Sequence, residues 1–188
     1  QAVPIHIPVS AKIRLGYTDT SRMDDIRGAI ADSGADWLTI HARTKTQGYK
    51  PPAYWEKIQR FNALDIPVIA NGEIWNAEHG QNCMIQAGTQ HLMLGRGAVT
   101  RPDLIAQVDT YNNDIETLTV LAWENLITHQ IKFLEGVAKS DVVLVGRYKQ
   151  WLAMLTKGYG EAKILWDRIK REKNKAAIIS ALQSSVRQ

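Results

Sequence analysis

Short apolar runs alternate with amphipathic segments through the first half of the chain. Four of the runs are typical of strands, and three of the segments between them have helical spacing. The predicted strands cover residues 9–15, 37–41, 66–70 and 91–94, and the predicted helices cover 21–33, 54–64 and 77–87. Strands and helices that alternate in this way indicate a parallel sheet with right-handed crossover connections. We therefore predict an α/β fold for this part of the chain.

After Pro102 the strand pattern stops, and the remaining residues have helical spacing. Predicted helices cover residues 116–137, 141–157, 161–173 and 174–186. In the first of these, one apolar face is formed by Leu118, Leu121, Ile127, Ile131 and Leu134. The sequence thus predicts two domains, an α/β domain over residues 1–112 and an all-α bundle over residues 113–188.

The third predicted strand ends in residues suited to ligand binding. Pro67-Val-Ile-Ala70 runs directly into Asn71-Gly72-Glu73. A short run of continuously apolar residues suits a strand that is buried on both faces. Gly72 permits close backbone approach, and its neighbours supply an amide and a carboxylate. Taken alone, the stretch is equally compatible with an ordinary turn.

The other predicted strands also end in polar residues. These residues are Lys12 and Arg14, then His41 and Arg43, and finally Gly95-Arg96-Gly97. A single charged strand end is usually a solvated rim residue. Parallel strands, however, bring their carboxyl ends to one edge of the sheet, where α/β folds bind ligands. Four such ends in succession predict a ligand site along that edge.

Individual residues of this edge have both a binding and a structural interpretation. Lys12 has apolar neighbours, so its ammonium is expected to face a ligand atom that gains negative charge, with a salt bridge to Glu73 as the alternative. His41 alone would be a satisfied structural histidine, but beside Arg43 ligand binding is favoured. Gly95 and Arg96 combine free backbone N–H groups with a guanidinium, which suits an anion.

Composition sets limits on the class of protein. The chain has 188 residues, of which 45% are hydrophobic and 22% charged, as in ordinary globular proteins. It contains neither a run of about 18 apolar residues nor a signal-peptide pattern at its amino end, so we expect no membrane span and a cytoplasmic location. The single cysteine, Cys83, lies within a predicted helix and is expected to be a buried hydrophobe rather than a catalyst. The histidines have no spacing typical of a metal site.

Positive charge is concentrated in the helical half. Residues 1–112 hold 11 Lys and Arg and 11 Asp and Glu, whereas residues 113–188 hold 12 and 8. This division indicates that the helical half faces a polyanion. Arg147-Tyr-Lys-Gln-Trp151 combines cations, an amide and aromatic rings, which favours RNA. The alternative is that Trp151 packs inward while the cations are merely solvated.

Four motifs together resemble the tRNA-dihydrouridine synthases. They are Ser10-Ala-Lys-Ile-Arg-Leu-Gly16, Ile40-His-Ala-Arg-Thr44, Pro67-Val-Ile-Ala-Asn-Gly-Glu-Ile74 and Leu94-Gly-Arg-Gly-Ala98. Their order resembles the second half of a flavin-binding (β/α)8 TIM barrel. The helices that follow are similar to those of the bacterial C-type enzyme, which acts on uridine 16 of tRNA. The resemblance covers nearly the whole chain.

The resemblance implies an oxidoreductase that uses FMN and NADPH to reduce uridine in tRNA to 5,6-dihydrouridine. The implied FMN-binding residues are Lys12, His41, Asn71, Gly72, Glu73, Gly95 and Arg96, and the implied tRNA-binding residues are Arg14, Arg147, Lys149 and Gln150. The family's proton-donating cysteine and the first half of its barrel have no counterpart here. The chain therefore resembles a carboxyl-terminal fragment, expected to be inactive alone and to pair with another copy or with the missing half.

Two other functions remain open at this point. One is an FMN-dependent TIM-barrel oxidoreductase that acts on a small molecule, with the basic helices incidental. The other is a noncatalytic RNA-binding fragment, because the proton donor and half of the flavin pocket are absent. Binding of tRNA with a steep salt dependence separates the first from a tRNA enzyme, and binding of FMN tests the second.

Overall fold

The computed structural model describes residues 3–112, 120–136 and 140–185. Contacts divide the chain into two compact units. The first unit is Gln1–Gly95 with Val108–Glu116, and the second is Arg96–Gln107 with Thr117–Gln188. Each unit has its own hydrophobic core, so each is described separately below.

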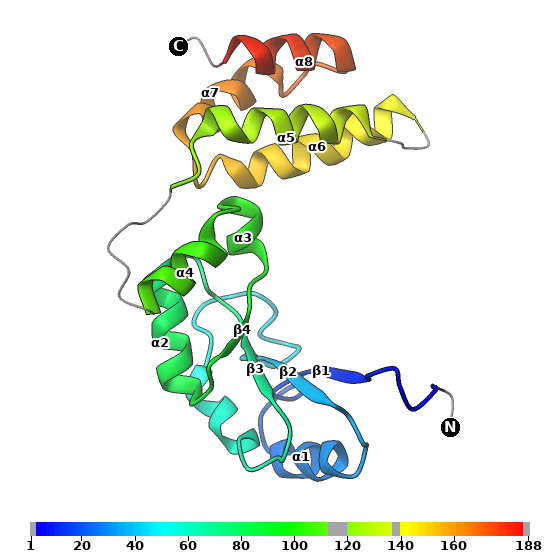
Figure 1. Ribbon diagram of the computed structural model, residues 1–188, viewed down its shortest axis with the longest axis vertical. Helices are drawn as coiled ribbons and strands as arrows, with labels where there is room; N and C mark the ends of the chain where they lie inside the picture. The colour runs from blue at the N-terminus through cyan, green and yellow to red at the C-terminus, as the bar shows by residue number, and fades with distance from the viewer. Residues whose placement is uncertain (1–2, 113–119, 137–139, 186–188) are drawn as a thin grey trace. The chain divides into compact units, whose positions relative to one another are not determined.

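The first unit is built on a sheet of four parallel strands in sequence order (Figure 1). The strands are β1 (Ser10–Arg14), β2 (Trp37–His41), β3 (Val68–Asn71) and β4 (His91–Met93). Each strand pairs in parallel with the next one along the chain. The predicted α/β alternation with a parallel sheet is confirmed.

Helices cover one face of this sheet. They are α1 (Met23–Ala31), the 3-10 helix η1 (Trp55–Phe61) and α2 (Ala77–Ala87). Every second strand residue, such as Leu38, Ile40 and Ala70, packs against them in the core. Ile69 on the opposite face of β3 is only half-buried. The prediction that β3 is buried on both faces therefore holds fully only for its helix-covered face, and the other face is half-buried.

Two helices of the first unit differ from their predicted forms. The helix predicted over residues 21–33 begins only at Met23, without a side-chain cap. The carboxylate of Asp19 accepts hydrogen bonds from the Ser21 N–H and hydroxyl at 2.9 and 2.6 Å. Residues 54–64 form the shorter 3-10 helix. Its buried residues Ile58 and Phe61 are three positions apart, which matches a helix of three residues per turn.

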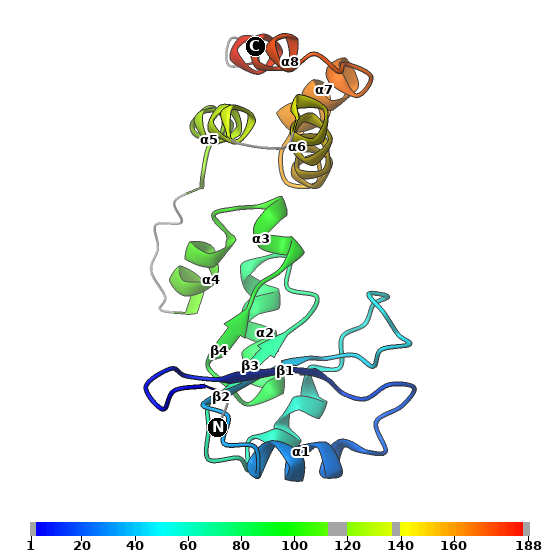
Figure 2. The same cartoon turned by 90° about the vertical axis from the view of Figure 1, so that its right-hand side faces the viewer.

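The second unit is helical. Its core packs α5 (Trp123–Glu135), α6 (Asp141–Leu155), α7 (Gly160–Ile169) and α8 (Lys175–Ser184) against one another (Figure 2). The short helix α3 (Arg96–Thr100) packs against α6, and α4 (Leu104–Asn112) follows it. Ser140 and Asn174 cap α6 and α8 through their side chains.

The predicted apolar face of the first bundle helix is confirmed where the structure describes it. Ile127 and Leu134 are buried, and Leu121 and Ile131 pack against the same core. The helix begins at Trp123 rather than at residue 116. Leu118 and the ends of the predicted helices at residues 116–119, 137 and 186 lie outside the described residues.

Candidate active site

The carboxyl edge of the sheet brings together residues from neighbouring strands. In register, Arg14 pairs with His41, His41 with Asn71, and Asn71 with Met93. Side chains alternate along a strand, and the residues between these, such as Ile13, Ile40 and Ala70, pack into the helix-covered core. The row from Arg14 to Met93 therefore lies on the other face of the sheet.

Lys12 and Asn71 lie within reach of each other across this face. The Lys12 ammonium is 3.4 Å from the Asn71 Oδ1, and the Asn71 Nδ2 donates to the Met93 carbonyl at 2.6 Å. The amide is thus held from both sides, which fixes its orientation. Lys12 is exposed, so water reaches its ammonium in spite of its apolar neighbours, and the expectation that it faces a ligand atom stays a prediction. Those neighbours point to the opposite face of the strand.

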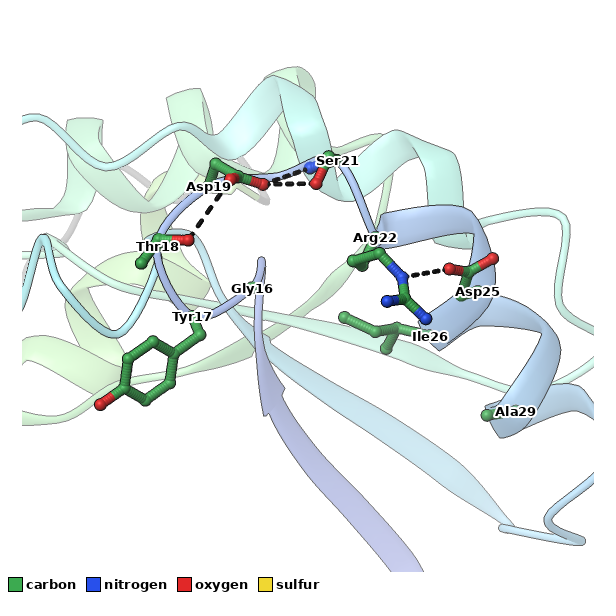
Figure 3. Close-up of a pocket in the computed structure, with 9 residues that line it drawn as sticks. All are labelled: Gly16, Tyr17, Thr18, Asp19, Ser21, Arg22, Asp25, Ile26 and Ala29. Carbon is green, nitrogen blue, oxygen red and sulfur yellow. Dashed lines mark hydrogen bonds and ion pairs between the residues drawn. The ribbon is translucent and has the colours of Figure 1, made fainter.

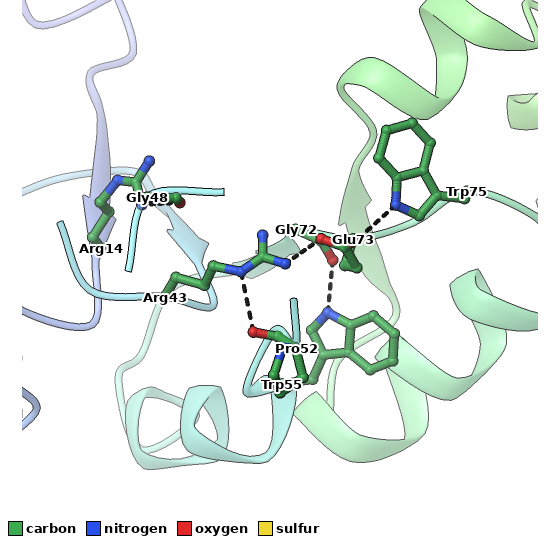
Figure 4. A network of polar contacts seen from close by, with 8 residues as sticks. All are labelled: Arg14, Arg43, Gly48, Pro52, Trp55, Gly72, Glu73 and Trp75. Carbon is green, nitrogen blue, oxygen red and sulfur yellow. Dashed lines mark hydrogen bonds and ion pairs between the residues drawn. The ribbon is translucent and has the colours of Figure 1, made fainter. Parts of the chain in front are cut away.

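Glu73 has a fully buried cationic partner, Arg43 (Figure 4). The Arg43 Nη2 pairs with the Glu73 carboxylate, and its Nε donates to the Pro52 carbonyl at 3.1 Å. The Trp75 indole N–H donates to the other carboxylate oxygen at 2.9 Å. The carboxylate is therefore engaged by two groups of the protein itself.

Gly72 occupies a position where both the backbone conformation and the neighbouring His41 ring exclude a larger residue. Its φ is +121°, and an added Cβ would lie 2.9 Å from Cδ2 of the buried His41 ring. The Trp55 indole donates to the Gly72 carbonyl at 2.7 Å. Glu73 also has a positive φ, of +59°, which costs about 1–3 kcal/mol for a residue with a side chain. Packing and hydrogen bonds around this loop offset that cost.

Arg14 braces the loop that follows β2. Its Nη1 donates to the carbonyls of Thr44 and Gly48 at 3.0 and 2.9 Å. Its guanidinium also lies 5.3 Å from the centre of the Tyr49 ring, and that ring is 5.7 Å from His41. Tyr49 itself is 62% exposed. An exposed aromatic ring held by a cation at the sheet edge offers a stacking surface for a planar ligand.

Gly95 and Arg96 follow β4, where the sequence predicts an anion site. Both are exposed. Gly95 is the last residue of the first stretch of the first unit, and Arg96 opens α3 and the second unit. An added Cβ at Gly95 would meet nothing within 4 Å, so packing does not require glycine at that position.

Cys83 is buried on α2, with an exposed fraction of 0%. Burial raises the pKa of its thiol to about 12, which leaves it protonated and unreactive at neutral pH. The expectation of an inert, packed cysteine is confirmed. A separate hollow of about 510 Å³ lies between the loop after β1 and α1, lined by residues such as Tyr17, Asp19 and Ile26 (Figure 3). It contains none of the predicted site residues.

The three predicted tRNA contacts on α6 do not form one cluster. Arg147 and Gln150 are exposed, but Lys149 lies about 200° from Arg147 around the helix axis. The Lys149 ammonium donates to the carbonyls of Lys170, at 2.9 Å, and Glu172. Trp151 packs partly buried against the bundle core, which agrees with the inward-packing interpretation.

Comparison with known proteins places this chain in a family. The family model for "Dihydrouridine synthase (Dus)" matches residues 1–185. The chain belongs to the dihydrouridine synthase family. It is 43% identical over 175 residues to a tRNA-dihydrouridine(16) synthase of Pseudomonas syringae pv. tomato, covering 92% of this chain and 55% of that protein.

Other relatives with the same name are similarly related. The one from Pseudomonas putida is 41% identical over 181 residues, and the one from Shewanella oneidensis is 39% identical over 189 residues. These matches cover 95% and 98% of this chain but 56% and 58% of the relatives. The dihydrouridine synthase chain thus spans a little over half the length of the curated relatives that it matches.

The sequence pattern alone does not indicate several of the residues at the carboxyl edge of the sheet in this dihydrouridine synthase. The sequence pattern marks Arg43 as a charged strand end beside His41 but does not indicate its pairing with Glu73. It assigns no role to Tyr49, Trp55 or Trp75. The positions of the two tryptophans on either side of the Asn-Gly-Glu sequence were the available signal, because a buried indole usually finds an acceptor for its N–H. Among the described residues, no helix is long and apolar enough to cross a membrane.

Proposed function

We propose that this chain is the carboxyl-terminal part of an FMN-dependent tRNA-dihydrouridine synthase that acts on uridine 16. Its first unit would be half of a TIM barrel, and its helical unit would bind tRNA. The observation that carries the proposal is the in-register row at the sheet edge, where Lys12 and Asn71 approach to 3.4 Å beside His41. An ammonium, an amide and an imidazole on one face suit the polar edge of a flavin ring.

The residues present fit FMN. Lys12, His41 and Asn71 would contact the ring system, and Gly72 would lie beside them, where an added Cβ would collide with the His41 ring. Gly95 and Arg96 would hold the phosphate end. Bound FMN, reduced by NADPH, would supply the hydride that uridine receives at C6. The Glu73 carboxylate already binds Arg43 and the Trp75 indole. Glu73 would therefore contribute by fixing the conformation of the Asn-Gly-Glu loop through its pair with Arg43.

Other residues would handle the RNA and the proton. Arg14 would present the loop that carries Tyr49 to the flipped-out uridine, while Arg147 and Gln150 would contact the tRNA body. The proton for C5 would come from a cysteine outside these residues, since Cys83 is buried on α2. NADPH and tRNA as reactants suit a cytoplasmic enzyme. The fragment alone would lack part of the flavin pocket.

The test separates the two binding activities. In the intact enzyme, Lys12→Ala is expected to weaken FMN binding, measured by quenching of flavin fluorescence, and to leave tRNA affinity within about twofold. Arg147→Ala is expected to do the reverse, with a shallower salt dependence of tRNA binding. A small-molecule oxidoreductase would show no salt-dependent tRNA binding in the wild type. Equal effects of both substitutions on both ligands would contradict the proposed division.

A further inference from the structure

The Asn-Gly-Glu loop after β3 contains two consecutive residues with positive φ. Gly72 has a φ of +121° and Glu73 a φ of +59°. Glycine adopts such a conformation easily but has many others open to it, so the loop keeps one arrangement only where surrounding contacts fix it. Arg43 and Trp75 hold the Glu73 side chain. The peptide group that joins Gly72 to Glu73 is held by a different residue.

That residue is Trp55, the first residue of η1. Its indole N–H donates to the Gly72 carbonyl at 2.7 Å (Figure 4), which is at the short end of the range for N–H···O hydrogen bonds. The Trp55 side chain is half-buried and packs against the core of the first unit. The contact therefore joins the helix layer of this unit to the backbone of the loop.

The backbone beside Trp55 is itself attached to the strand ends. The N–H of the preceding residue, Tyr54, donates to the Ala42 carbonyl at 2.8 Å, and the Ala42 N–H donates to the Asn71 carbonyl at 2.9 Å. Two hydrogen bonds thus run from the start of η1 through the end of β2 to the residue before Gly72. The indole reaches the loop from a fixed base, so it can hold the orientation of the peptide group.

The geometry of the peptide bond carries this contact to the other side of the loop. The bond between Gly72 and Glu73 is trans, and in a planar trans peptide the C=O and N–H groups point in opposite directions. The Gly72 carbonyl is turned toward η1, which lies on the helix-covered face of the sheet. The Glu73 N–H is therefore turned away from η1. The side chains of Lys12 and Asn71 approach each other on the face opposite the helices.

We infer that Trp55 is a positioning residue for the flavin: by holding the Gly72 carbonyl, it turns the Glu73 N–H toward FMN as a hydrogen-bond donor. The inference rests on the proposed function, because the carbonyl and phosphate oxygens of FMN supply the acceptor. Trp55 itself does not contact the flavin. Without its N–H the peptide group can rotate, and a rotated peptide presents a carbonyl, which accepts, where FMN requires a donor. A tryptophan with a structural role alone would stabilise the fold without affecting FMN.

Replacement of Trp55 by benzothienylalanine in the intact enzyme tests the inference. Sulfur takes the place of the indole nitrogen, so the side chain keeps its shape but loses its donor. We expect the Kd for FMN, measured by quenching of flavin fluorescence, to rise about 5–10-fold. Amide exchange in residues 72–74 should accelerate in the FMN-free enzyme, and its melting temperature should fall by about 1–4 °C. Trp55→Phe also removes the donor and should weaken FMN binding at least as much.

The same replacement of Trp123 is the matched control. The Trp123 indole donates to the Ser185 hydroxyl at 3.2 Å within the helical unit, so the control also loses one indole hydrogen bond. We expect a similar fall in melting temperature and a change in the FMN Kd of less than about twofold. Equal weakening of FMN binding in the two variants would overturn the inference, because general destabilisation would then explain it.

Two further outcomes are decisive. An unchanged FMN Kd in the benzothienylalanine variant of Trp55, with faster exchange in residues 72–74, would overturn the inference because the hydrogen bond would then serve the fold alone. Absence of FMN binding by the wild-type enzyme would refute the proposed function together with the inference. The wild-type measurement separates that failure from a failure of the positioning role.

Discussion

Glu73 combines an unfavourable backbone conformation with a buried ion pair. A positive φ at a residue with a side chain persists only where the surroundings fix it, and here Arg43 and Trp75 both hold the carboxylate. Arg43 has an exposed fraction of 0%, so neither partner can be removed without leaving a poorly solvated charge. The pair therefore determines the conformation of the Asn-Gly-Glu loop.

Replacing Arg43 tests that dependence. Arg43→Met keeps the volume but leaves Glu73 unpaired, and we expect a loss of about 3–5 kcal/mol in the free energy of unfolding. Amide exchange in residues 71–75 should accelerate as well. The matched control is Arg22→Met, which breaks the exposed pair with Asp25 and should cost less than about 1 kcal/mol. Similar losses in the two variants would show that the buried pair has no special role.

Gly72→Ala tests whether the close packing of Gly72 against the His41 ring requires glycine. The added Cβ would lie 2.9 Å from the His41 ring at a φ of +121°, so we expect destabilisation of about 1–3 kcal/mol and weaker FMN binding by the intact enzyme. Gly28→Ala is the control, because Gly28 lies within α1 and an added Cβ meets nothing within 4 Å. That change should stabilise the helix by up to about 1 kcal/mol. Chemical denaturation of the two variants gives the comparison, and tolerance of Gly72→Ala would contradict the predicted clash with the His41 ring.

At the scale of elements, local pattern predicted the strands well and the helix ends less well. The four strands lie within about two residues of their predicted limits because alternation and apolar runs mark them directly. The late start of α1 at Met23 was not predictable from spacing, because the Ser21 hydroxyl donates to the Asp19 carboxylate and does not cap the helix. The Arg43–Glu73 pair joins residues 30 positions apart, and the contact of Lys149 with Glu172 spans 23 positions. Such contacts depend on the tertiary fold rather than on spacing along the sequence.

A second ion pair joins elements of the helical unit. Asp103 accepts from Arg101 at 2.7 Å, from the Gln107 amide at 2.7 Å and from the Leu121 N–H at 2.9 Å. Arg101 in turn donates to the Gly158 carbonyl and lies over the Tyr159 ring. These contacts tie the segment before α4 to the beginning of α5 and to the turn between α6 and α7.

The pKa of Asp103 makes this junction sensitive to acid. Burial alone would raise the pKa, but the hydrogen bonds from Arg101 and Leu121 and the Arg101 charge outweigh it and lower the pKa. A carboxyl whose pKa is lowered on folding contributes stability above its unfolded pKa, and that stability is lost as the pH falls through the folded value. We expect thermal melts of the helical signal to show this loss below the ordinary Asp range. Asp103→Asn should be less stable at neutral pH and should lack this step, and an unchanged acid profile would contradict the argument.

At the scale of the whole molecule, the first unit leaves much of its sheet unpaired. Within the described residues, β1 pairs only with β2 and β4 only with β3. Open sheet edges readily accept further strands, and closure into a barrel removes both edges. Val9, next to the β1 edge, is 45% exposed. The relatives extend well beyond the matched region, so the proposed barrel would be completed by residues outside this chain.

We therefore expect the isolated chain to self-associate or to pair with the remaining half of the barrel. Sedimentation should reveal concentration-dependent association, and a dye for exposed apolar surface should bind. Val9→Lys should reduce self-association because a charge beside an edge strand opposes strand addition. Val142→Lys, at an exposed position of α6, adds the same charge away from the sheet and should have little effect. A monomer that binds no dye would contradict the open-edge prediction, and equal effects of the two lysines would assign association to net charge rather than to the sheet edge.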